Sequence, residues 1–201
     1  EQHIRREKAN SNICTSQVLL ANLAGMYAVY HGPEGVKRIA QRIHALASAF
    51  ADVVAASKTG NLKVVHSHFF DTVLVDCGPG ADDIYQAALK RGFNLRRVSD
   101  TVLGVAFHEE SSAEDFAVLT RLFTGSEAAL PENITGKLSA EVLRRDAILS
   151  HEVFNRYHTE HEMLRYLKKL ENKDLALNHS MISLGSCTMK LNATAEMLPI
   201  T

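Results

Sequence analysis

The chain has 201 residues, 46% of them hydrophobic, and its 22 Lys and Arg residues nearly balance 23 Asp and Glu residues. A net charge of −1 gives no bulk attraction to nucleic acid or to an anionic membrane. No apolar run approaches the ~18 residues that a membrane-spanning helix needs. Three scattered cysteines, Cys14, Cys77 and Cys187, are typical of reduced thiols rather than of a disulfide framework.

The first part of the chain predicts two consecutive helices. The first begins at Ser11 or Asn12 and continues to about His31; it is apolar nearly all round, so we expect it to be largely buried. Gly32-Pro33 ends it and starts the second helix, which ends at Thr59-Gly60. Apolar residues recur there at three- and four-residue steps: Val36, Ile39, Ala40, Ile43, Leu46, Ala47, Phe50, Val53 and Val54.

A mixed pattern follows up to residue 125. Short, mostly Val-rich runs predict four strands, at 62–66, 72–77, 95–98 and 102–107. A helix is expected between Asp82 or Asp83 and Gly92, and another between Ser112 and Gly125, where Ser112 and Asp115 resemble a capping box. The order indicates an α+β fold, with an antiparallel sheet that carries helices on one face.

The last third of the chain has a different character. Residues 126–138 predict a surface connection, and 138–149 a short helix. Thr159 and Glu162 form a second capping box, before a helix that ends at 171–174. The tail beyond has too little apolar surface for a core of its own. We therefore expect the chain, which opens without Met, to be a piece of a longer protein.

Two histidine pairs and one glycine-rich run suggest a metal site and a phosphate loop, but the surrounding sequence favours neither. His66 and His68 are expected on one face of a strand, and His158 and His161 one helical step apart. No HExxH motif or paired CxxC accompanies them, so we predict no metal site. The Cys77-Gly-Pro-Gly80 run suits a turn better than a phosphate loop, because it lacks the Gly-Lys-Ser/Thr ending.

Two features near the start of the chain leave alternatives open. Arg5, Arg6 and Lys8 could clamp an anion or a phosphate, but three basic residues before a helix are more often solvated or paired with nearby acids. Cys14 lies close to a helix start, where the helix dipole lowers the pKa of a thiol, but the pattern favours a buried and inert cysteine.

The most reactive stretch is His179-Ser-Met-Ile-Ser-Leu-Gly-Ser-Cys-Thr-Met-Lys-Leu-Asn192. Gly185 allows a close approach of the backbone, and the amides and hydroxyls beside it are suited to hold a phosphate or a carboxylate. The alternative is a turn with a helix cap. The candidate residues are Ser186, Cys187, Thr188, His179 and Asn192.

This stretch resembles the HSMIPLGSCTMKLN segment of the glycine decarboxylase P-protein family, except that Ser183 replaces a proline. Three further runs are similar to the same family: Glu1-Gln-His-Ile-Arg-Arg6 with Ser11-Asn-Ile-Cys-Thr15, Phe69-Phe-Asp-Thr72, and Arg165-Tyr-Leu-Lys-Lys-Leu-Glu-Asn-Lys-Asp174. The resemblance covers nearly the whole chain, in order.

The resemblance implies a pyridoxal-phosphate-dependent enzyme with an aspartate-aminotransferase-like fold, built from two related halves. Residues 1–125 would be the small C-terminal domain of the N-terminal half. Residues 126–145 would be the linker, and 146–201 the mostly helical start of the catalytic C-terminal half. The lysine that binds the cofactor would lie beyond residue 201, so Lys190 is not assigned that role.

The implied reaction is the decarboxylation of glycine on pyridoxal phosphate, with transfer of the aminomethyl group to the lipoyl arm of H-protein. Ser186, Cys187 and Thr188 would lie near the glycine carboxylate or the cofactor, with His179 and Asn192 as supports. Further partners would be another P-protein half or subunit, in a homodimer for the full-length chain, with no nucleic acid and no membrane.

The chain alone would be inactive and would bind no cofactor covalently. The family implies the cytoplasm in a bacterium or the mitochondrial matrix in a eukaryote. The rival hypothesis is a free-standing α+β module for binding or dimerisation.

Overall fold

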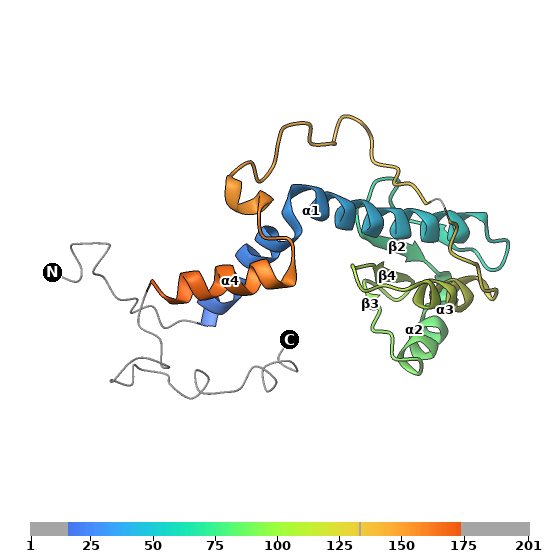
Figure 1. Ribbon diagram of the computed structural model, residues 1–201. Helices are drawn as coiled ribbons and strands as arrows, with labels where there is room; N and C mark the ends of the chain where they lie inside the picture. Colours follow the sequence, from blue (N-terminus) through green and yellow to red (C-terminus); the bar gives the residue numbers. More distant parts are fainter. Residues whose placement is uncertain (1–15, 133, 174–201) are drawn as a thin grey trace. The chain divides into compact units, whose positions relative to one another are not determined.

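The computed structural model describes residues 16–132 and 134–173 (Figure 1). The chain divides into two compact units. One unit comprises residues 35–146; among the described residues, the other comprises 16–34 and 147–173. Over these described stretches, no helix combines the length and the apolar character that crossing a bilayer requires.

A four-stranded antiparallel sheet lies at the centre of the 35–146 unit. Its order is β1 (Lys63–Val64), β2 (Thr72–Asp76), β4 (Val102–Ala106) and β3 (Arg96–Arg97). The sequence prediction of an antiparallel sheet is therefore confirmed. Each of the two edge strands pairs with its neighbour over two residues only, so both are shorter than predicted.

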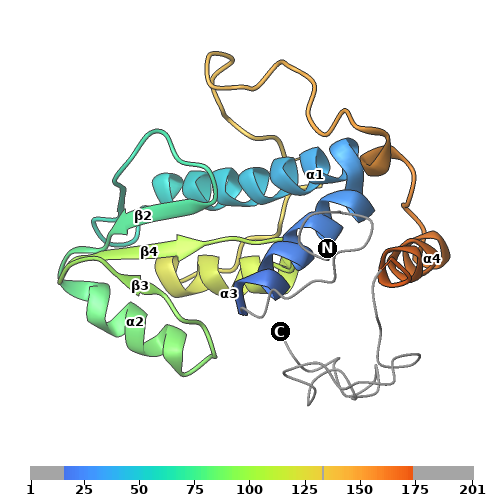
Figure 2. The same ribbon diagram turned by 90° about the vertical axis from the view of Figure 1, so that its left-hand side faces the viewer.

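One face of the sheet holds the hydrophobic core. The inward residues of the two central strands are Val73, Val75, Leu103 and Val105, all at most 2% exposed. Covering this face are α2 (Ala81–Leu89), α3 (Ala113–Thr124) and the part of α1 (Ser16–Ala56) after residue 34, because their buried residues belong to the same cluster. Figure 2 shows this part of α1 beside β2 and α3 close to β4.

An aromatic trio joins two of these helices in the core. Phe50 of α1 is fully buried, with its ring centroid 5.6 Å from that of Phe107 and 5.4 Å from that of Phe123 on α3. The predicted three- and four-residue apolar period of the second helix is thus the period of its buried face.

The ends of α3 follow the predicted local chemistry. The Ser112 side chain accepts from the backbone N–H of Asp115, and the Asp115 carboxylate accepts from the N–H of Ser112, which completes a capping box. Gly125 ends the helix with φ 79°, in the left-handed conformation that favours glycine.

In the other unit, α1 is kinked at Gly32, where φ is 62° and ψ is −179°. The kink and Pro33 separate the two predicted helices. The expected burial of the first helix holds on one side only: Val29 is 3% exposed, whereas Leu23 is 58% exposed. After the turn η3 (Glu152–Asn155), Thr159 caps α4 (Glu160–Glu171), as predicted, by accepting from the N–H of Glu162.

The prediction of a helix at 138–149 is wrong. The segment forms turns and bends instead, and two of its central apolar side chains stay exposed: Val142 is 67% exposed and Leu143 is 50% exposed. The preceding connection is not purely a surface segment. Ala128, Leu130 and Ile134 are partly buried against the core.

Candidate functional site

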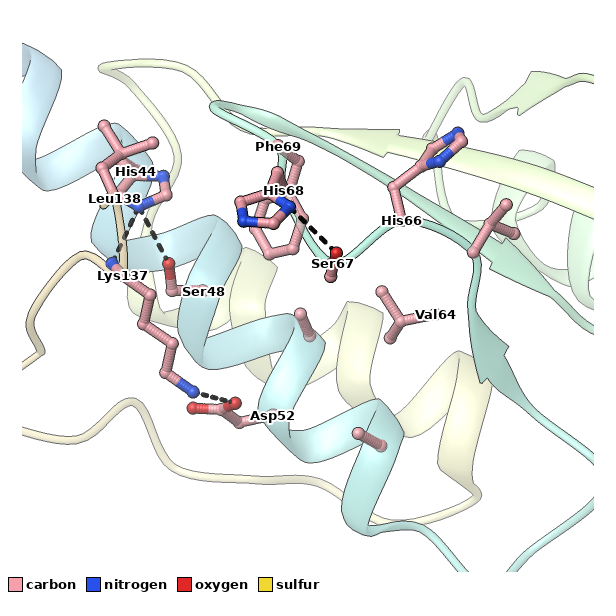
Figure 3. A pocket seen from close by; sticks show the side chains of 13 residues that line it. His44, Ser48, Asp52, Val64, His66, Ser67, His68, Phe69, Lys137 and Leu138 are labelled. Atoms are coloured by element: carbon pink, nitrogen blue, oxygen red, sulfur yellow. Dashed lines mark hydrogen bonds and ion pairs between the residues drawn. The ribbon is translucent and has the colours of Figure 1, made fainter. Parts of the chain in front are cut away.

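A cavity of about 410 Å³ opens in the 35–146 unit, between α1, residues 64–69 and the segment Lys137–Leu138 (Figure 3). Its lining mixes aliphatic and polar side chains, and it brings together three histidines. The residues labelled in Figure 3 are His44, Ser48, Asp52, Val64, His66, Ser67, His68, Phe69, Lys137 and Leu138.

His44 is the centre of the polar contacts in this cavity. It is 4% exposed; its Nδ1 lies 2.8 Å from the Phe70 carbonyl oxygen, and its Nε2 lies 2.9 Å from the backbone nitrogen of Lys137. The carbonyl accepts and the amide donates, so the ring proton belongs on Nδ1 and Nε2 is the acceptor. This tautomer satisfies both partners, which gives His44 a structural role.

The position of the His44 ring also explains why residue 136 is a glycine. A Cβ added at Gly136 would lie 2.3 Å from Cδ2 of the His44 ring. That ring is stacked on Phe70 with an interplanar angle of 3° and a centroid distance of 5.8 Å, so it has little freedom to move aside. Only glycine fits at position 136 while the segment stays against α1.

The chemistry available in the cavity is limited. The Lys137 ammonium forms an ion pair with Asp52 (Figure 3), and the lysine side chain is 60% exposed. The ion pair therefore holds the exposed end of Lys137 against Asp52 of α1.

The predicted histidine pairs are not built as expected. His66 and His68 follow β1 outside any strand, where the Ser67 hydroxyl lies 2.9 Å from Nδ1 of His68. His158 precedes the helix cap Thr159, so it does not share a helical face with His161. Within residues 16–132 and 134–173, no three His, Cys, Asp or Glu side chains gather as a possible metal site.

His158 has a different role, at the kink of α1. Its Nδ1 lies 2.7 Å from the Tyr30 carbonyl oxygen, one of the acceptors that the end of a helix leaves without an intrahelical partner. A Cβ at Gly32 would lie 2.6 Å from Cε1 of His158 and 2.7 Å from the Phe154 carbonyl oxygen. Glycine at 32 is thus required both by backbone conformation and by space.

Cys77 is buried, and its thiol has low reactivity. Burial, and secondarily the negative charge of Asp76, raises the pKa of its thiol to about 11. The thiolate is the nucleophilic form, so Cys77 is unreactive near neutral pH. Cys14 and Cys187 lie outside the described residues.

The site predicted from sequence also lies outside the described residues. This holds for His179, Ser186, Cys187, Thr188 and Asn192, and likewise for Lys190, Arg5, Arg6 and Lys8. What the sequence analysis missed is the contact between His44 and Gly136. A histidine inside an apolar helical stripe was the available signal, but its partner lies too far along the chain to be predicted from local pattern.

Comparison with known proteins gives the family. The sequence profile described as glycine cleavage system P-protein matches residues 1–123. The chain belongs to this family. Among solved structures, this P-protein chain is similar to a crystal structure of glycine decarboxylase (P-protein) of the glycine cleavage system in inhibitor-bound form. The two are 25% identical with a TM-score of 0.47, and the match covers 62% of this chain and 29% of that one.

Two bacterial relatives are similar to the P-protein chain over its whole length. A glycine dehydrogenase (decarboxylating) of Psychrobacter cryohalolentis is 68% identical over 203 residues, and one of Chromobacterium violaceum is 66% identical over 204 residues. Each match covers 100% of this chain and 21% of the relative. The chain therefore spans about one fifth of the length of the curated relatives it matches.

Proposed function

We propose that this P-protein chain is part of a glycine dehydrogenase (decarboxylating). The whole enzyme would decarboxylate glycine with pyridoxal phosphate and pass the aminomethyl group to the lipoyl arm of H-protein. The observation that carries the proposal is the alignment of the entire chain, at 66–68% identity, with bacterial proteins of that name. When bound, the cofactor would supply the electron sink for loss of carbon dioxide.

The proposed arrangement places residues 1–125 at the end of an N-terminal half with an aspartate-aminotransferase-like fold. Residues 126–145 would connect it to the catalytic half, which would begin at 146. The end of a compact unit at Asp146 supports the boundary before the catalytic half, although the same division groups residues 16–34 with 147–173 rather than with 35–125. Ala128, Leu130 and Ile134 are partly buried against the core, which supports counting the start of the connection with the first half.

The proposed contribution of this chain to the active site comes from residues 179–192. Ser186, Cys187 and Thr188 follow Gly185, and short hydroxyl side chains beside a glycine are a residue pattern that suits the glycine carboxylate or a phosphate. His179 and Asn192 would support this segment. The cofactor lysine would lie beyond residue 201, so the chain alone would be inactive.

The partners follow from the same proposal: glycine, lipoylated H-protein, and another P-protein half or subunit in a homodimer. The near-neutral net charge gives no support to a nucleic-acid partner. The enzyme would work in the cytoplasm of a bacterium, or in the mitochondrial matrix of a eukaryote.

The test uses the full-length P-protein with H-protein and measures the release of carbon dioxide from glycine. Truncating both hydroxyls, with Ser186→Ala and Thr188→Ala, should raise the KM for glycine or lower kcat severalfold. Thr101→Ala, at an exposed turn, is the control and should change neither. A wild-type protein that leaves glycine intact would reject the function; an active wild type with unaffected variants would reject only the site.

A second measurement concerns the 201-residue chain alone. We expect no covalent adduct after incubation with pyridoxal phosphate and reduction with borohydride, as judged by intact mass. An adduct formed at one lysine in equimolar yield would contradict the placement of the cofactor lysine outside this chain.

A further inference from the structure

The first part of α1 leaves apolar side chains exposed along one stripe. Leu19 and Leu23 lie one helical turn apart and Tyr30 lies two turns further on, with Leu20 beside them, so at 100° per residue the four cover a stripe about 100° wide. Leu19 is 52% exposed, Leu20 66% and Leu23 58%. The other apolar side of the same helix is covered, since Val29 is 3% exposed.

The remainder of this helix is not a solvent face. No Asp, Glu, Lys or Arg occurs between Lys8 and Glu34. The side next to the stripe, beyond Leu20, carries Gln17 and the small residues Ala21, Ala24 and Ala28. By contrast, α4 is a solvated helix in the same unit, and charged residues occupy half of its 12 positions: Glu160, Glu162, Arg165, Lys168, Lys169 and Glu171.

We propose that the α1 stripe, residues 19, 20, 23 and 30, docks on a part of the P-protein polypeptide that lies outside these 201 residues, an inference that rests on the proposed function. A helix that is apolar or small all round is typical of a protein interior, where it is surrounded on several sides. The chain covers only 21% of its relatives, so most of the polypeptide that could surround the helix lies elsewhere in the sequence.

Two other occupants suit this helix less well. A second copy of the chain, docking through one stripe, would leave the side with Gln17, Ala21 and Ala24 in water, and that side lacks the charges of a solvated face. A membrane surface attracts amphipathic helices that carry Lys and Arg on the polar side, and this helix has neither.

Hydroxyl-radical footprinting of the wild-type full-length P-protein tests whether the stripe is covered. Leu19, Leu20 and Leu23 should be oxidised severalfold more slowly in the native protein than in the same protein unfolded in urea. Native rates close to the unfolded rates would overturn the proposal. This measurement needs no variant, so a failure to fold cannot obscure its result.

A photo-crosslink identifies what covers the stripe. With p-azidophenylalanine in place of Tyr30 in the full-length protein, illumination should give an intrachain product that keeps the mass of a single chain on a denaturing gel. Its second peptide should map outside residues 1–201. A product of doubled mass, or a second peptide from within residues 1–201, would overturn the proposal. The result is independent of catalysis, so it also separates this inference from the proposed function.

Discussion

Replacing Gly136 with alanine should destabilise the 35–146 unit through one contact. The new Cβ would lie 2.3 Å from Cδ2 and 3.1 Å from Nε2 of His44, well inside van der Waals distance. The imidazole has little freedom to move aside, because its Nδ1 is hydrogen-bonded to the Phe70 carbonyl oxygen and its ring is stacked on the Phe70 side chain. The 136–138 segment must therefore lift away from α1.

The magnitude follows from what that movement breaks. Overpacking by one methyl group typically costs about 1–3 kcal/mol. Lifting the segment instead loses the 2.9 Å hydrogen bond from Lys137 to His44, worth about 1 kcal/mol. The exposed Lys137–Asp52 ion pair adds little. We expect a loss of ~2 kcal/mol in the free energy of unfolding.

Urea unfolding of the 201-residue chain, followed by far-UV circular dichroism, measures this loss. Gly80→Ala is the matched control, because φ at Gly80 is −81° and a Cβ there meets nothing within 4 Å; its effect should stay within about 0.5 kcal/mol. In a His44→Ala background the ring is gone, so Gly136→Ala should cost much less. An equal cost of Gly136→Ala in both backgrounds would refute the reasoning.

Three further outcomes are expected. Ser112→Ala should lower the free energy of unfolding by ~1 kcal/mol in the same urea assay, because it removes the side-chain cap of α3; no change would mean that the cap is not formed. Gly32→Ala should straighten or detach the kink of α1, seen as faster proteolytic cleavage near residues 150–158, whereas Gly25→Ala, with open space around it, should not. For Cys77, the native alkylation rate, read by peptide mass, should keep rising from neutral pH toward pH 11; a plateau near pH 8.5 would contradict the raised pKa. Since the neutral thiol is the favoured form, its stabilising contribution is present below the ordinary pKa of about 8.5 and is lost as the pH rises toward 11.

Local sequence patterns predicted most of the fold. The apolar period before Thr59, the Ser112 capping box and the Thr159 cap depend on interactions within a few residues, and the structure contains all three. The segment at 138–149 shows the limit of such reasoning. Its apolar residues suggested a helix, but a short helix must bury one face, and the central Val142 and Leu143 stay exposed.

Contacts between distant residues were beyond prediction from pattern. The hydrogen bond from the Lys137 backbone N–H to His44 joins positions 93 residues apart, and no sequence periodicity connects them. The exposure of Leu20 and Leu23 was missed because pattern shows that a side is apolar but not what covers it. The candidate residues Ser186, Cys187 and Thr188 lie outside the described chain, so their role stays a prediction.

The shortness of the outer strands affects how the sheet can associate. β1 and β3 contribute two residues each, and both residues of β3 are exposed arginines. A strand added beside β1 could pair with only two residues, and a strand added beside β3 would meet two arginine side chains. Growth of the sheet by addition of further strands is thereby discouraged, which protects the molecule against aggregation through its borders.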